Sequence, residues 1–211
     1  MRAPPGLHVR DIKVEGVGPW LWVETDMWAW NHPGPEFAPL RDLVLANTPE
    51  PKVIVQAGGC MGMYPRLLSE LFETVYTFEP DPVNFYCLTA NCPSERIVKV
   101  QAALSDRAGV GSLDVAPSFN AGMFKVGDAP GATLVLRLDD LRLPRLDALQ
   151  LDCEGHEDRI IQGGMGTIRA CLPVIVVEKP GAALRELLAG LGYKEVGHTG
   201  TLPDVAFSAR Q

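Results

Sequence analysis

The sequence predicts an α/β fold in which helices cover both faces of a largely parallel β-sheet. Three observations predict it. Short apolar runs of strand type alternate with helical patterns from residue 53 onward. The first apolar run is followed at once by a glycine-rich turn. The last two predicted strands have no helix between them, so one of them is expected to run antiparallel.

The first 50 residues are predicted to form an N-terminal extension that packs on the domain of residues 51–211. Residues 9–15 and 20–23 are typical of a short hairpin, because two apolar runs flank the turn sequence Gly-Val-Gly-Pro. A short helix is expected at residues 36–46, and two following prolines, Pro49 and Pro51, end it.

The strands of the predicted sheet lie at residues 53–55, 75–78, 97–104, 148–151 and 174–177. Apolar residues then recur at helical spacing from Tyr64, which predicts the first connecting helix. Asp81 can cap the second helix, with Pro82 at its first position. A third helix is expected to begin at Glu157, and a fourth is stopped by Gly192.

The stretch of residues 107–145 reads as irregular, with a hairpin at 109–115 and a strand at 133–137. Two final strands are expected near residues 194–197 and 205–209. Polar residues stand where the predicted strands end, namely Gln56, Glu79, Asp106, Asp152 and Glu178. Because such sheets bind ligands at the carboxyl ends of their strands, this edge is the expected site.

Length, charge and cysteine content exclude several classes of protein. A chain of 211 residues fits one domain, and no apolar run approaches the roughly 20 residues of a membrane span. The first residues lack a signal-peptide pattern, so a soluble, cytoplasmic protein is expected. A net charge of −7 without a basic cluster disfavours a nucleic-acid partner. Five cysteines without a Cys-x-x-Cys pair argue against a zinc site or a disulfide framework.

The glycine-rich turn carries the strongest functional signal. Gly58, Gly59 and Gly62 follow a strand and precede a helix, where glycine lets the backbone turn tightly and approach a ligand. Glu79 follows Gly58 by 21 residues, the spacing at which an acidic residue reaches ribose hydroxyls. Together they indicate a cofactor that contains adenosine. The alternative is a tightly packed turn beside a solvated glutamate.

Several motifs, in this order, resemble the FkbM-type methyltransferases. Residues 56–62 read Q-A-G-G-C-M-G, where the family usually has D-x-G-A-N-x-G, and residues 78–85 read F-E-P-D-P-V-N-F, like the family's F-E-P-x-P. Asn91 and the stretches A-L-S-D (103–106), L-D-D-L (138–141) and L-D-C-E-G-H-E (151–157) also fit, and Val177-Glu178 closes the match. The resemblance implies a Rossmann-like class I methyltransferase fold, with a seven-stranded, mostly parallel sheet whose last strand is antiparallel.

The resemblance also implies roles toward S-adenosylmethionine. The glycine loop should line the methionine and ribose parts, and Glu79 should accept hydrogen bonds from both ribose hydroxyls. Residues 103–106 should flank the adenine, and Asp152 should lie near the cationic amino or sulfonium group. The expected cofactor-binding residues are Gln56, Gly58, Gly59, Cys60, Gly62, Glu79, Pro80, Ala103, Leu104, Ser105, Asp106 and Asp152.

The chain departs from the family pattern at three positions. Gln56 replaces the usual Asp, Cys60 the usual Asn, and Gln150 the usual Lys two residues before Asp152. The first and fourth strands of this fold are expected to be neighbours. We therefore interpret Gln56 and Gln150 as a coupled change, in which two neutral amides replace a pair of opposite charges, because losing both charges is easier than burying one alone.

Three residues are candidates for catalysis, Asp152, Glu154 and His156, because they follow one strand end. For His156 the alternative is a solvent-exposed histidine in a first helical turn, and for Glu154 it is charge compensation at a helix N-terminus. Asp152, Glu154 and Glu178 could instead collect Mg²⁺, but no tight ligand motif supports this, and no metal centre is predicted.

Three further residues are candidates for contact with the acceptor, namely Asn120, Trp28 and Trp30. Asn120 could instead serve turn geometry beside Gly122. The four tryptophans within residues 20–30 could instead anchor the N-terminal hairpin, and Trp20 and Trp22, which share a strand face, are expected to be packed.

The predicted function is methyl transfer from S-adenosylmethionine, with S-adenosylhomocysteine as product. Transfer to a hydroxyl of a small molecule or a sugar is implied by the resemblance alone. Two alternatives stay open at this point: a small NAD(P)-dependent oxidoreductase, and a catalytically inactive adenosine-binding module that serves interactions.

Overall fold

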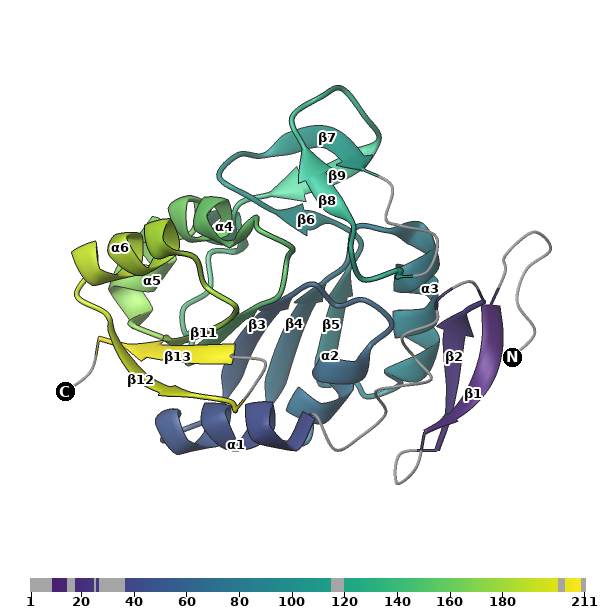
Figure 1. Ribbon diagram of the computed structural model, residues 1–211, viewed down its shortest axis with the longest axis horizontal. Helices are drawn as coiled ribbons and strands as arrows, with labels where there is room; N and C mark the ends of the chain where they lie inside the picture. Colours follow the sequence, from purple (N-terminus) through teal and green to yellow (C-terminus); the bar gives the residue numbers. More distant parts are fainter. Residues whose placement is uncertain are drawn as a thin grey trace.

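The computed structural model describes residues 9–14, 18–24, 26, 37–114, 120–200 and 204–209. Its centre is a seven-stranded sheet in the order β12-β13-β11-β10-β3-β4-β5 (Figure 1). The strands of this sheet are β3 (Val53–Ala57), β4 (Thr74–Phe78), β5 (Ile97–Val100), β10 (Ala148–Leu151), β11 (Val174–Glu178), β12 (Lys194–His198) and β13 (Asp204–Ser208).

The direction of the strands confirms the predicted sheet. Strands β5, β4, β3, β10 and β11 pair in parallel, whereas β13 is antiparallel to both β11 and β12. The parallel strands are joined by segments that contain helices, and β12 reaches β13 through a turn without one. The expected antiparallel last strand is therefore β13.

Helices cover both faces of this sheet. One face is packed by α1 (Phe37–Asn47), α2 (Met63–Leu68) and α3 (Pro82–Asn91), whose buried residues share a core with Ile54 and Val176. The other face is packed by α4 (Glu157–Gly163), α5 (Met165–Cys171) and α6 (Ala182–Gly190), together with Leu149 and Val177. Side chains along β10 alternate between these two cores, as expected for a strand with both faces covered.

Two predicted elements are broken in the structure. The strand expected at residues 97–104 ends at Val100, and Ala103–Leu104 forms a separate strand, β6, in a second sheet. A tight turn in which Ala102 N donates to Val100 O (3.0 Å) separates them. The helix expected from Glu157 is interrupted at Gly164, which caps the end of α4 and the start of α5 and packs so close to Leu138 that a Cβ would lie 2.6 Å from its Cδ2. The spacing of apolar residues predicts which positions are buried, but it does not predict where a strand or a helix is interrupted.

The second sheet has the order β6-β9-β7-β8 and lies above the carboxyl ends of the main strands (Figure 1). It contains β7 (Gly109–Asp114), β8 (Lys125–Gly127) and β9 (Thr133–Leu136) besides β6. The strand expected at residues 133–137 is present as β9, but the hairpin expected at 109–115 is wrong, because residues 109–114 form a single strand that pairs with β8 and β9. The second sheet forms one side of the candidate site.

The N-terminal hairpin consists of β1 (Val9–Val14) and β2 (Gly18–Val23) and lies against α3 (Figure 1). Trp20 and Trp22 are buried, which confirms that this pair is packed. The division at residue 50 stays a prediction. Leu40 and Val44 of α1, which precede it, are part of the main core.

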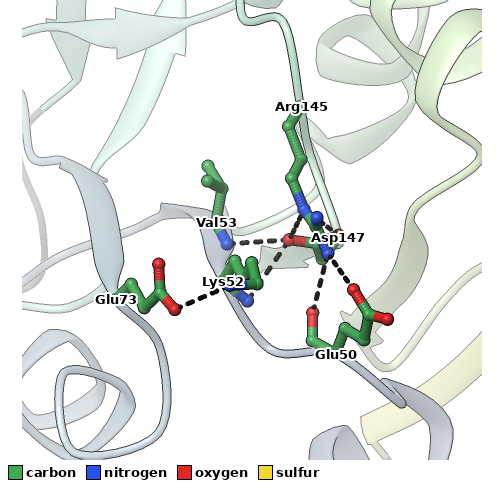
Figure 2. Close-up of polar contacts among 6 residues, drawn as sticks. All are labelled: Glu50, Lys52, Val53, Glu73, Arg145 and Asp147. Carbon is green, nitrogen blue, oxygen red and sulfur yellow. Dashed lines mark hydrogen bonds and ion pairs between the residues drawn. The ribbon is translucent and has the colours of Figure 1, made fainter.

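Asp147 joins the amino-terminal ends of β3 and β10 (Figure 2). Its carboxylate is 7% exposed and accepts hydrogen bonds from Val53 N (2.8 Å) and from Lys52 N (3.3 Å). Arg145 Nε lies 2.8 Å from both carboxylate oxygens and its guanidinium also pairs with Glu50. A second ion pair, between Lys52 and Glu73, is exposed.

We expect Asp147→Ala to lower the free energy of unfolding by about 2–3 kcal/mol, because it leaves a backbone donor of β3 without its acceptor. Urea denaturation measures the effect. The matched control is Glu73→Ala, which breaks only the exposed pair and should cost less than about 1 kcal/mol. Equal losses in the two variants would show that Asp147 does not join the strands as inferred.

Candidate active site

A pocket opens between the carboxyl ends of the main strands and the second sheet. Residues from both sheets, from α3 and from the loop after β10 form its wall. They are Ala57, Gly58, Phe78, Glu79, Pro80, Asn84, Ala103, Leu104, Ala121, Gly122, Phe124, Val126, Asp152, Cys153 and His156. Most of these residues are apolar and the charged groups are few, as is usual for a small-molecule site.

The glycine loop after β3 forms the floor of the site. Gly58 and Gly62 have φ values of +87° and +95°, in the region that favours glycine, and Cys60 also has a positive φ of +43°. A Cβ on Gly58 would lie 1.9 Å from the backbone oxygen of Asp152, so the loop and the end of β10 touch through backbone atoms. Gly58 lines the pocket. A Cβ on Gly62 would lie 2.6 Å from Cys92 Sγ, so this position has no room for a side chain.

Glu79 holds the loop in place from the end of β4. Its Oε2 accepts a hydrogen bond from Cys60 N (2.7 Å) and its Oε1 accepts one from Asp81 N (2.8 Å). The side chain is 4% exposed, and burial raises its pKa to about 7 although both backbone donors lower it. Glu79 therefore lies on the pocket wall as a buried carboxyl group, and the alternative of a solvated glutamate is wrong.

Asn84 is a pocket residue that the sequence reasoning missed. It is 1% exposed, and its Nδ2 donates to Ala121 O at 2.7 Å. Within the described part of the chain, its Oδ1 has no hydrogen-bond partner. The available signal was its place in the F-E-P-D-P-V-N-F motif, three residues after the Asp81 cap. A buried acceptor without a partner beside a pocket suits a ligand that carries a donor.

Residues 121–126, which we call the roof, close the pocket from the side of the second sheet. Ala121, Gly122, Phe124 and Val126 line the pocket from this segment. The enclosed cavity is about 40 Å³, well below the roughly 300–1,000 Å³ of typical small-molecule sites. A ligand as large as a nucleoside therefore requires the roof to move outward.

Asp152 ends β10 and lies close to Glu178, which ends β11. Burial raises the pKa of Asp152, and the charge of Glu178 raises it further. Glu178 also forms an ion pair with Lys179 (2.5 Å), and burial raises the pKa of the neighbouring Asp204 to about 6. The negative charge of Glu178 disfavours the ionised form of Asp152, which is why it raises the pKa of Asp152.

A second hollow, of about 430 Å³, lies beside these carboxyl groups. Glu154, Gly155, Glu157, Asp158, Glu178, Lys179, Gly181, Ala183 and Leu184 line it. Glu154 and Lys179 both have positive φ, at +52° and +45°. Backbone strain of this kind persists only where the surrounding structure holds the residue in place, and it is found most often at functional sites.

His156 is buried, so the alternative of a solvent-exposed histidine is wrong. Its Nε2 lies 2.9 Å from Ser105 Oγ, which also contacts Asp106 Oδ1 at 3.0 Å. Burial and the charge of Arg159 lower the pKa of His156 and favour the neutral ring. His156 lines the first pocket beside Ala103 and not the second hollow, which places it away from Glu154 and Glu178.

The structure gathers only part of the predicted set around the first pocket. Gly58, Glu79, Pro80, Ala103, Leu104, Asp152 and His156 line it. The remaining predicted residues support the wall from behind or lie beside it, namely Gln56, Gly59, Cys60, Gly62, Ser105 and Asp106, and Glu154 lines the second hollow. Asn120 is not on the wall, and its Oδ1 accepts from Gly122 N (2.9 Å), which is the turn geometry given as its alternative. Trp28 and Trp30 lie outside the described residues.

Gln56 and Gln150 lie directly opposite each other on β3 and β10, as expected of neighbouring strands. Gln56 Nε2 donates to Gly58 O (2.9 Å), and its Oε1 accepts from Thr77 Oγ1 (2.5 Å). The Gln150 amide is fully buried, and among the described residues none is its partner. The two positions are adjacent, and the coupling of the two changes stays a hypothesis.

Among the described residues, no group of three or more His, Cys, Asp or Glu side chains is placed to hold a metal ion. The Mg²⁺ alternative at Asp152, Glu154 and Glu178 remains unsupported. No helix in this part of the chain has the length and apolar character to cross a membrane.

Comparisons with known proteins give a consistent result. The model of the methyltransferase FkbM domain matches residues 70–195. A curated relative, the hexuronic acid methyltransferase AglP of Haloferax volcanii, is 27% identical over 163 residues, which cover 73% of this chain and 63% of the relative. The chain therefore spans less than two thirds of that protein's length.

Solved structures show the same fold. Methyltransferase FkbM from Methylobacillus flagellatus has a TM-score of 0.52 at 17% identity, covering 75% of this chain and 43% of its own. Magnesium protoporphyrin IX methyltransferase from Synechocystis, with bound S-adenosylmethionine, has a TM-score of 0.52 at 10% identity, covering 83% and 78%. The predicted class I methyltransferase fold is confirmed by these likenesses.

The raised pKa of Glu79 predicts a pH-dependent stability. Between its ordinary pKa of 4.5 and its folded value of about 7, the folded protein binds more protons at this site than the unfolded chain. The contribution of Glu79 is therefore complete below pH 4.5 and is lost as the pH rises through 7. Relative to the wild type, Glu79→Gln should gain about 3 kcal/mol of unfolding free energy between about pH 4.5 and pH 8.

Chemical denaturation at a series of pH values measures this difference. The matched control is Glu73→Gln, at an exposed position far from the pocket. A difference between Glu79→Gln and the wild type that stays constant with pH would contradict the assignment of a buried, protonated Glu79.

Proposed function

Because the chain belongs to the FkbM methyltransferase family, we propose that it is an S-adenosylmethionine-dependent methyltransferase that modifies a hydroxyl oxygen of a sugar or another small molecule. The observation that carries the proposal is the buried carboxyl group of Glu79 on the pocket wall, bonded to the glycine loop. This carboxyl group places a hydrogen-bond acceptor beside the tight turn of the glycine loop, at the carboxyl ends of the strands, where sheets of this kind bind ligands.

The residues of the pocket fit the adenosyl part of the cofactor. Glu79 offers acceptor oxygens to ribose hydroxyls, and the free Oδ1 of the buried Asn84 offers another. Ala103, Leu104 and Phe124 provide apolar walls for a flat ring. Ionised Asp152 would complement a cationic ligand, and such a ligand would lower the pKa of its carboxyl group.

S-adenosylmethionine, when bound, would supply a methyl group whose bond to the sulfonium sulfur breaks as a bond to the acceptor oxygen forms, with S-adenosylhomocysteine as the leaving group. The protein then has to hold the acceptor in line and receive the proton of its hydroxyl. Positioning of this kind can contribute about 7–11 kcal/mol. We assign the positioning to the second hollow, which lies beside Asp152 and is lined by charged residues able to hydrogen-bond a polar acceptor.

Asp152 is the group that we assign to take the proton. A carboxyl group with a raised pKa is a better base than an ordinary one, and both burial and Glu178 raise the pKa of Asp152. The proton leaves the acceptor oxygen for a carboxylate oxygen of Asp152 and can be shared with Glu178. Glu154 is the second candidate, because it lines the hollow and its pKa is also raised by burial and by Glu178.

A sugar acceptor is supported by the relative from Haloferax volcanii, which is named for hexuronic acid. The net charge of −7 and the absence of a basic cluster disfavour a nucleic-acid acceptor. A cytoplasmic location is part of the same proposal and rests on composition alone. The family match does not support the oxidoreductase alternative. A measurement of methyl transfer would distinguish an enzyme from a catalytically inactive adenosine-binding module.

We expect S-adenosylhomocysteine and S-adenosylmethionine to bind in calorimetric titrations, and NADPH not to bind. Glu79→Ala should weaken binding of both by about 1.5–3 kcal/mol, because the ligand hydroxyls would then be buried without their hydrogen-bond partner. The matched control is Glu73→Ala, an exposed position at the opposite edge of the sheet. Absence of binding to the wild type at millimolar concentration would overturn the proposal.

Asp152→Asn should reduce methyl transfer to a panel of sugars by about 10²–10⁴-fold, because general-base assistance is lost. Mass spectrometry of the products measures turnover. In the wild type, activity should rise with pH as the Asp152–Glu178 pair loses its proton, and the variant should lose this rise. If Glu154→Gln shows the larger loss instead, the base is Glu154 and the assignment to Asp152 is wrong.

A further inference from the structure

The backbone N–H and C=O groups of one residue, Ala121, attach the roof to the N-terminal segment and to α3. Asp26 Oδ2 accepts a hydrogen bond from Ala121 N at 2.6 Å, and Asn84 Nδ2 donates to Ala121 O at 2.7 Å. Asp26 is 2% exposed and Asn84 is 1% exposed. The residue that begins the roof is therefore held from both sides by buried side chains, one of them from a segment 95 positions earlier.

The strand before Asp26 is itself held firmly against the glycine loop. Asn91 of α3 pairs with both backbone groups of Leu21, at 2.7 Å and 2.8 Å, and its Nδ2 also donates to Met61 O at 2.7 Å. Val23 N contacts Met61 Sδ at 3.3 Å. The side chains of Trp20, Trp22, Met61 and Ala121 belong to one buried cluster. The described residues 20–23 and Asp26 thus contact the glycine loop at the floor of the pocket as well as its roof.

This segment lies outside residues 70–195, the part that matches the family domain. We propose that residues 18–26 complete the cofactor site, and that Asp26 is a positioning residue that holds the roof over the bound adenosyl group. The proposal rests on the proposed function, since it takes the ligand of the pocket to be S-adenosylmethionine or its product. Asp26 does not line the pocket and acts through Ala121.

The chemistry of the contact explains why an acid is suited to this position. A carboxylate that accepts a backbone N–H makes a shorter and stronger hydrogen bond than a neutral acceptor does. The bond is shielded from water by the surrounding cluster, which strengthens it further. Because the closed cavity is smaller than a nucleoside, entry and release of the ligand both need the roof to lift. The strength of this bond therefore sets how long the ligand stays.

The test is the rate at which S-adenosylhomocysteine leaves the full-length protein, measured by stopped-flow displacement. Asp26→Ala should release it about 10-fold faster, because a charge-assisted hydrogen bond is lost. Asp26→Asn keeps an acceptor oxygen for Ala121 N and should stay within about threefold of the wild type. If Asp26→Ala does not fold, Asp26→Ser replaces it, since its side chain is too short to reach Ala121.

Arg66→Met is the matched control for general loosening of the hairpin. Arg66 stacks over Trp20 at 5.1 Å and donates to Asn91 O at 3.4 Å, so its loss disturbs the same interface from the side of the glycine loop. It should lower the melting temperature and leave the release rate unchanged. Amide exchange at residues 120–126 without ligand gives a second readout, and it should accelerate in Asp26→Ala but not in Arg66→Met.

The outcomes separate the two proposals. If the wild type does not bind S-adenosylhomocysteine, the proposed function fails. Independently of ligand binding, unchanged amide exchange at residues 120–126 in Asp26→Ala would show that Asp26 does not hold the roof. If the wild type binds and Asp26→Ala releases the ligand at the wild-type rate, the role of Asp26 is wrong. If Arg66→Met releases it as fast as Asp26→Ala, the hairpin acts only through general stability, which also overturns the proposal.

Discussion

The candidate site depends on the carboxyl group of Glu79, which accepts hydrogen bonds from the backbone of Cys60 and of Asp81. These bonds join the glycine loop after β3 to the start of α3, so the floor and one wall of the pocket form a unit. Burial makes the carboxyl group hard to ionise, and the two backbone donors offset part of that cost. A group held in this way keeps its position for a ligand without reorganisation on binding.

The other charged groups of the site lie at the same edge of the sheet, where the carboxyl ends of the parallel strands meet. Parallel strands end side by side, so Asp152 and Glu178 meet although they are 26 residues apart. Burial and the charge of Glu178 raise the pKa of Asp152, which makes its carboxylate a stronger base for the proton that the proposed methyl transfer would release. The sheet therefore places Glu79 and Asp152 on opposite sides of the glycine loop, where we propose that they bind the ribose and accept the proton.

Several parts of the site could not be predicted because they depend on contacts between distant segments. Asn84 and Ala121 meet across 37 positions, and Asp26 and Ala121 across 95. None of the three belongs to a pattern with a period, and each is a common residue in turns or helices. His156 was expected to act on the acceptor, but its Nε2 lies 2.9 Å from Ser105 Oγ, and it lines the first pocket together with Ala103 and Leu104.

The sequence by itself determined the class of fold, the order of its strands and helices, and the glycine loop with its acid. These follow from the spacing of apolar residues and from the local conformations that glycine, proline and capping residues allow. Only the tertiary structure decided that residues 97–104 split between two sheets, that the roof narrows the pocket, and that the N-terminal strand holds that roof. Such features arise where buried polar groups must find partners, and partners far apart in the chain become neighbours only after folding.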